Sequence, residues 1–234
     1  APGNGVHGQL HELVQSQYGP GPRRCHVRLQ PKLSGLSQRH NQRIFSARSV
    51  PQILAQVLKE HGITEEDRRF DLRGDYPLRD FCMQNRESDL QLLQRLCAEE
   101  NIHYYFEHPK RGHCLVFVEG PASPAVAVKP RMHSLQRAWV VEVDEARPDP
   151  SRPVAVQFDW VYEGEGAAPS HCWLPLAAEL AGPTASPLSE GTEVVVSFIE
   201  GDPDQPVIAG FLQAPAPAGR LHATGQSGGA AHLD

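Results

Sequence analysis

The sequence predicts an α+β protein, mainly β, in which an α+β part precedes a five-stranded antiparallel barrel. Two segments with helical apolar periodicity, residues 50–61 and 89–100, both lie in the first half of the chain. From Gln136 onward the pattern changes to short β-rich runs separated by turns. Within that half, residues 190–212 contain two apolar runs joined by a Gly-Asp-Pro-Asp turn, the pattern of a hairpin.

In the first half, several short segments have the composition of strands. Residues 8–15 and 24–30 alternate apolar and polar side chains, as half-buried antiparallel strands do. Further extended segments are expected at residues 43–45 and 70–72, and a hairpin at residues 102–119 with its turn at 108–112.

The two helices have clear start signals. Ser49 and Ser88 are suitable N-caps, and each is followed three positions later by a glutamine that completes a capping box. The residues expected on the buried faces share helical spacing: Ile53, Leu54, Val57, Leu58, His61, Leu90, Leu93, Leu96 and Cys97.

The second half predicts a small closed barrel. The expected strands are 138–143, 154–160, 172–177, 194–199 and 207–211, with a loop at 181–187. The residues after 214 are rich in Ala, Gly and Ser and are expected to be flexible.

Composition excludes several classes of function. The net charge of −6 argues against a nucleic-acid surface, and no apolar run approaches the length of a bilayer span. The N-terminal residues lack the pattern of a secretory signal peptide. The cysteines form no CxxC pair, so they are expected to be buried or free thiols: Cys25, Cys82, Cys97, Cys114 and Cys172.

No residue pattern predicts a catalytic, metal or cofactor site. His103, His108, His113 and Cys114 do not have the spacing of known metal sites. Asp202 and Asp204 offer too few oxygens for calcium and are expected to stabilise their turn.

Other side chains that could suggest chemistry have simpler explanations. Adjacent strand residues point to opposite faces, so His171 and Cys172 cannot form a catalytic pair. The carboxylates of Glu99, Glu100, Glu163 and Glu165 are expected to be solvated. The tryptophans are expected in the core or at subunit contacts: Trp139, Trp160 and Trp173.

Two stretches resemble VgrG, the spike protein family of bacterial type VI secretion systems, which is related to contractile-phage tail proteins. The string EGTEVVVSFIEGDPDQPVIAG resembles the family's OB-type barrel. RIFSARSVPQILAQVLKEHGI and YPLRDFCMQNRESDLQLLQRLCAEENIHYYFEH resemble its hub, the part related to the phage baseplate hub. The resemblance covers most of residues 40–213.

The resemblance implies a domain order and a set of structural or interface residues. Residues 1–120 would form an incomplete hub-like domain, 121–135 a linker, 136–213 the OB-fold barrel at the spike base, and 214–234 a flexible tail toward a needle. The family's second hub half has no counterpart here. The implied motif residues are Arg79, Gln84, Arg86, Glu87, Asp89, Trp173, Gly191, Glu193, Gly201, Asp202, Pro203, Asp204, Pro206 and Gly210.

The resemblance also implies a function. Such a protein would be a non-enzymatic spike component that forms a homotrimer at the tip of the secretion tube. It would contact the tube protein, a tip cap protein and effectors, assemble in the bacterial cytoplasm and then be translocated into target cells. No cofactor, nucleic acid or stable membrane anchor is implied. The alternative is a monomeric OB-fold module that binds nucleic acid or a glycan. An effector enzyme is not expected, because about twenty residues after the barrel are too few for a catalytic domain.

Overall fold

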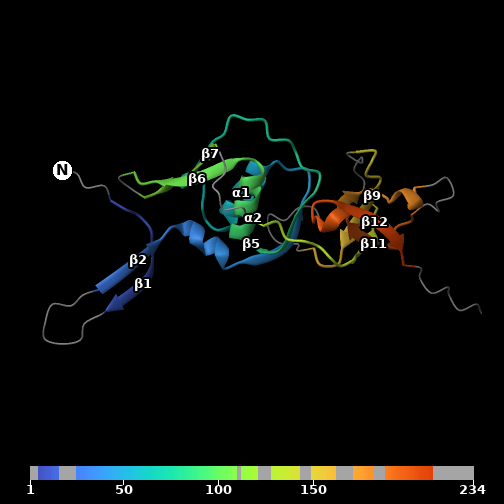
Figure 1. The fold of residues 1–234 in the computed structure, drawn as a ribbon, viewed down its shortest axis with the longest axis horizontal. Helices are drawn as coiled ribbons and strands as arrows, with labels where there is room; N and C mark the ends of the chain where they lie inside the picture. Colours follow the sequence, from blue (N-terminus) through green and yellow to red (C-terminus); the bar gives the residue numbers. More distant parts are fainter. Residues whose placement is uncertain are drawn as a thin grey trace, which may run out of the picture.

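The computed structural model describes residues 5–15, 25–109, 112–120, 128–142, 149–161, 171–181 and 188–212. It has three parts in chain order, an extended hairpin, a region with two helices and a barrel (Figure 1). The chain is α+β and mainly β, and its fold class is as predicted.

The first part is the hairpin of β1 (Gln9–Gln15) and β2 (Cys25–Gln30), which extends away from the rest of the molecule (Figure 1). A bulge near His11 places Leu10 and Leu13 on one face, opposite Leu29 and Val27. This apolar hairpin face is more than 40% exposed at every one of these side chains. The 3₁₀ helix η1 (Lys32–Ser37) follows and was not anticipated.

The core of the helical region is formed by α1 (Val50–Glu60) and α2 (Asp89–Glu99). Both capping boxes are present. Gln52 accepts the N–H of Ser49 at 2.9 Å, and Gln91 accepts that of Ser88 at 2.8 Å. The predicted buried face of α1 is confirmed at its four aliphatic positions. On α2, Leu92 is buried and Leu90 only half-buried, so the expectation for Leu90 was wrong.

A three-stranded sheet covers these helices on one side. Its strand order is β4 (Arg68–Asp71), β7 (Cys114–Glu119), β6 (Ile102–Glu107). The β6–β7 hairpin was predicted, whereas the parallel pairing of β4 with β7 could not be seen in the local pattern. Leu115 and Phe117 of β7 enter the helical core.

A second, two-stranded sheet pairs β3 (His40–Phe45) with β5 (Cys82–Ser88), a strand that the sequence did not predict. Both faces of this sheet are buried along residues 43–45 of β3 and 82–85 of β5. Phe45 and Cys82, paired in register, pack in the helical core, while Ile44 and Met83 pack with the barrel core. Arg86 is the bulged residue of β5, exposed and with a φ of 53°.

The barrel is a curled sheet with the order β10 (Cys172–Leu174), β9 (Val154–Phe158), β8 (Gln136–Val140), β11 (Glu193–Phe198), β12 (Pro206–Phe211). It closes where Ile208 exchanges hydrogen bonds of 2.9 Å with Pro175 and Ala177. Two short 3₁₀ turns, η2 (Ala178–Leu180) and η3 (Ile199–Gly201), complete it. All five predicted strands are confirmed, with ends shifted by a few residues.

Some predictions lie outside the described residues. They concern the loops around residues 19–22 and 163–165, most of the loop at 181–187, the linker at 121–127 and the tail at 214–234. The domain boundaries stay a prediction.

Candidate functional site: two buried charge clusters around Asp89 and Arg95

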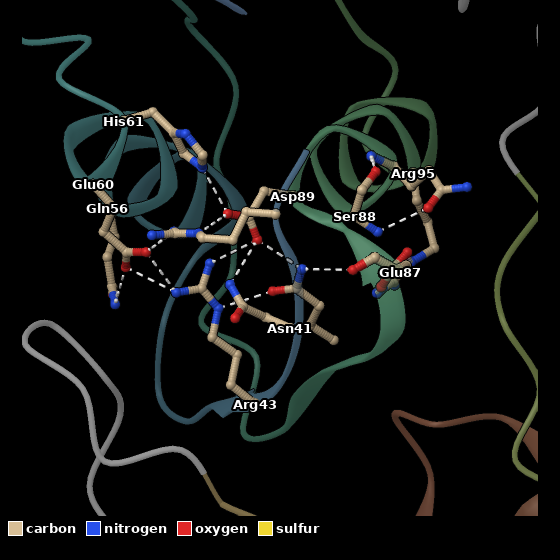
Figure 2. A network of polar contacts seen from close by, with 12 residues as sticks. Asn41, Arg43, Gln56, Glu60, His61, Glu87, Ser88, Asp89 and Arg95 are labelled. Atoms are coloured by element: carbon tan, nitrogen blue, oxygen red, sulfur yellow. Dashed lines mark hydrogen bonds and ion pairs between the residues drawn. The ribbon is translucent and has the colours of Figure 1, made fainter. Parts of the chain in front are cut away.

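Asp89 is the centre of a buried polar network between α1, α2 and the β3–β5 sheet (Figure 2). Its side chain is fully buried. Its Oδ2 accepts from Arg39 Nε at 2.6 Å and contacts His61 Nε2 at 2.7 Å. Its Oδ1 accepts from Gln84 Nε2 at 2.8 Å and Asn41 Nδ2 at 3.0 Å. The carboxylate of Asp89 therefore joins its own helix α2 to the start of β3, the end of α1 and β5.

Glu60 at the end of α1 is the second carboxylate of this network, and it pairs with the two arginines. Its two oxygens accept from Arg43 at 2.8 and 2.9 Å, and Arg39 also contacts it. Arg43 is buried, reaches Asp89 Oδ1 at 3.3 Å and lies over the ring of Phe45. Two arginines and two carboxylates thus neutralise one another, as buried charges must.

The pKa of Asp89 lies below its ordinary value. Burial opposes ionisation and would raise the pKa. Hydrogen bonds from Gln84 and His61, together with the positive charge of Arg43, outweigh burial and stabilise the carboxylate. The network thus keeps Asp89 charged in the interior.

A second cluster surrounds Arg95, which is buried on α2. Its guanidinium binds Glu87 through two nitrogens, at 2.6 and 3.2 Å, and donates to the carbonyl of Met83 at 3.0 Å. Burial raises the pKa of Glu87, and the adjacent Arg95 charge partly offsets this effect. Glu99 connects this cluster to Arg79 at 2.6 Å, and Arg79 also binds Glu100. Glu99 and Glu100, which were expected to be solvated, have side chains that are 26% and 23% exposed, and both are in addition ion-paired with Arg79.

The Gly-Asp-Pro-Asp turn of the barrel reaches into this second cluster. Asp204 Oδ1 accepts the backbone N–H of Met83 at 2.6 Å, and Oδ2 lies 3.5 Å from Arg95. Lys129 Nζ binds Asp204 at 2.8 Å and Asp202 at 2.7 Å. Asp202 also accepts the N–H of Asp204 at 2.9 Å, which is the expected turn-stabilising bond.

The remaining barrel residues that the sequence singled out lie in the same turn, near the start of β11 and along β12. Gly201 has a φ of 74° and Gly191 one of 77°, conformations that L side chains rarely adopt. Glu193 pairs with Arg137 at 3.0 Å. The rest take positions along the turn and β12: Pro203 and Pro206 are buried and Gly210 is half-buried.

Trp173 lines a pocket of about 790 Å³ at one end of the barrel, together with Leu176, Leu188 and Phe211. Glu142 and Glu190 are the charged residues of its lining. Three of its lining residues, Glu142, Ala181 and Leu188, are the first or last residues of described segments, so the described residues give only part of its lining. Its shape therefore assigns no ligand.

The site consequently combines predicted and unpredicted residues. Gln84, Glu87 and Asp89 come together in the networks, whereas Arg86 lies outside them on the surface. Sequence reasoning missed Arg39, Arg43, Glu60 and Lys129. One signal was available, because strand alternation places Arg43 on the same face as the buried Phe45.

Within the described ranges, no group of His, Cys, Asp and Glu side chains has the arrangement of a metal site. Helices long and apolar enough to cross a membrane are likewise not found among the described residues. The geometry shows that ion pairs join the two helices, the β3–β5 sheet and the barrel turn. No arrangement of nucleophile, base and acid appears in these two clusters.

The region with the two helices and the closed barrel together define a class of protein, the phage-type baseplate hubs that carry an injector OB domain. Residues 4–141 match the phage tail baseplate hub (GPD) family, and residues 136–212 match the type VI secretion system/phage-baseplate injector OB domain. The chain belongs to the baseplate hub family, as a VgrG-type spike protein.

Individual relatives agree with this assignment. The type VI secretion system spike protein VgrG4b of Pseudomonas aeruginosa is 49% identical over 115 residues, which are 49% of this chain and 14% of that protein. The actin cross-linking toxin VgrG1 of Vibrio cholerae is 42% identical over 118 residues, which are 50% of this chain and 11% of that protein. The matches thus span a small part of these curated relatives.

A solved structure has the same fold. The E. coli c3393 protein, described as a type VI secretion component similar in structure to the T4 tail proteins gp27 and gp5, superposes with a TM-score of 0.69. The match covers 88% of this chain and 83% of that chain at 20% identity.

Proposed function

We propose that the chain is the hub-and-barrel part of a homotrimeric spike at the tip of a type VI secretion tube. The observation that supports it best is the direct continuity of a hub match and an injector-barrel match in one chain. In this role the protein acts mechanically and not as an enzyme. Its partners would be the tube protein, a tip cap protein and effectors. It would assemble in the bacterial cytoplasm and be translocated into target cells.

The apolar hairpin face supports an assembled state. Leu10, Leu13, Val27 and Leu29 form a contiguous exposed apolar surface on a two-stranded sheet. Isolated two-stranded hairpins are marginally stable in water, and exposed apolar faces of this kind mark contact surfaces. The opposite face carries polar side chains, including the pair Glu12–Arg28 at 3.4 Å.

The test is light scattering coupled to size-exclusion chromatography. A homotrimer gives three times the 25.8 kDa of one chain. Leu13→Glu is expected to reduce the mass toward that of one chain, whereas the control Gln9→Glu, on the polar face of the same strand, leaves it unchanged. A wild-type protein with the mass of one chain would contradict trimer formation by these residues.

The alternative, a monomeric OB-fold binding module, is tested on the same sample. All three tryptophans, Trp139, Trp160 and Trp173, lie in the barrel. Their fluorescence should not change on titration with single-stranded DNA or an oligosaccharide. A saturable change from a monomer would favour the binding module.

A further inference from the structure

At Met83 the outer edge of β5 is closed by side chains instead of another strand. Met83 lies opposite Ile44 of β3, and its own N–H and C=O are bound on the other side by Asp204 and Arg95. Unpaired strand edges leave such groups open to other partners. Asp204 and Arg95 are themselves 3.5 Å apart, so an ion pair spans the peptide groups of Met83.

Three segments distant in sequence meet at this point. Arg95 comes from α2, Asp204 from the β11–β12 turn, and Lys129 from the segment that enters the barrel. The entering segment is also fixed by its backbone, because Met132 donates to the carbonyl of Gly201 at 2.8 Å. Asp204 is only 10% exposed, so its interactions are weakly screened by solvent.

Buried apolar side chains from both parts pack around the Asp204–Arg95 contact. Ile44, Phe81 and Met83 belong to the same buried cluster as the barrel residues Val196 and Phe198. The barrel core is therefore completed by side chains from the hub sheet. A second ion pair, Arg152 with Asp80 at 3.5 Å, also spans the junction.

We propose that the Asp202–Asp204 turn is a docking element that joins barrel and hub into one cooperative unit, with the Asp204 carboxylate as its central contact. The turn replaces a missing neighbour strand at the edge of β5, and the charges of Arg95 and Lys129 hold it there. The two parts then unfold together and transmit load without a hinge between them.

The chain contains separate spectroscopic probes for the two parts. The three tryptophans report on the barrel alone. The two α-helices of the described residues, α1 and α2, both lie in the hub and supply the α-helical signal in the far-ultraviolet circular dichroism. Coincidence of two such probes during urea unfolding is the standard sign of a single cooperative unit.

The decisive variant is Asp204→Asn, which keeps the side-chain shape and an acceptor for the Met83 N–H but removes the charge that faces Arg95 and Lys129. In the wild-type protein the two probes should give one urea midpoint. In the variant the tryptophan midpoint should fall below the helix midpoint by about 1 M, as expected for the loss of a charged contact in a small domain.

The matched control is Asp159→Asn, a barrel carboxylate that is 43% exposed and lies 3.6 Å from Arg137 in the same sheet. Its two midpoints should still coincide. Separate midpoints in the wild-type protein would overturn the proposal, and so would coincident midpoints in Asp204→Asn. Because both readouts come from a single chain, they do not depend on whether the protein forms a trimer.

Discussion

Replacement of Asp89 by Asn should strongly destabilise the hub. Every oxygen of the carboxylate is occupied, and both Oδ1 and Oδ2 face donors. An amide presents one oxygen and one NH₂ group, so in either orientation a donor faces another donor. Arg43, nearly fully buried, would keep Glu60 as its remaining charged partner. Breaking a buried ion pair costs about 3–5 kcal/mol, a large part of the roughly 5–15 kcal/mol by which such domains are stable.

The assay is urea unfolding followed by far-ultraviolet circular dichroism. The control is Glu107→Gln, which removes a carboxylate from the exposed pair with Arg69 and should leave the midpoint nearly unchanged. A loss of less than about 1 kcal/mol for Asp89→Asn would refute the reasoning, because a change of that size is typical of a solvated pair.

The pH dependence of Asp89→Asn gives a second check. The native pKa of Asp89 is depressed below its ordinary 3.8, so the unfolded state binds the proton more tightly. The stabilisation by this carboxylate is therefore complete above the ordinary pKa and is lost as the pH falls through the native one. The stability difference between wild type and Asp89→Asn should be constant near neutral pH and shrink in acid below about pH 4. A difference that grows in acid would contradict the assigned sign.

Three further predictions concern other elements. Gly201→Ala places a side chain at a φ of 74°, with the new Cβ 3.4 Å from the Met132 carbonyl oxygen. The variant should lose about 1–2 kcal/mol of unfolding free energy in the tryptophan-monitored transition, and no loss would refute the backbone argument. Ser88→Ala removes the side chain that accepts the Gln91 N–H and should cost about 0.5–2 kcal/mol by circular dichroism, whereas an unchanged midpoint would show that the cap is dispensable. A thiol reagent should label the exposed Cys25 before the buried Cys82, because burial raises the pKa of Cys82 to about 12. Mass spectrometry identifies the labelled residue, and fast labelling of Cys82 would contradict its buried position.

The parts of the fold that depend on local signals could be predicted from the sequence. The two helices were found because a serine cap and a glutamine three residues later stabilise the same turn. The barrel hairpin was found because its turn residues and β-branched runs act over a few residues. In each case the interactions that form the element lie within the element itself.

Strand β5 could not be predicted for the opposite reason. Gln84, Asn85 and Glu87 are polar, and nothing in their sequence indicates burial. The partners that satisfy Gln84 and Glu87 lie in other elements, Arg43 in β3 and Arg95 in α2. The bond between Asp204 and Met83, 121 positions away, could not be predicted either, because Asp204 also fits a local turn. The sequence motif singled out Gln84, Glu87 and Asp204, but it did not indicate which residues they bind.

The closed edge at Met83 also affects how the protein behaves when it is damaged. An open strand edge next to apolar side chains such as Phe81 and Ile44 is a template for adding strands from other molecules. Detachment of the barrel turn would uncover that edge and its apolar surroundings at the same moment. In the absence of urea, molecules in which the turn detaches should therefore associate through this edge more readily than the wild-type protein, so the turn also opposes aggregation.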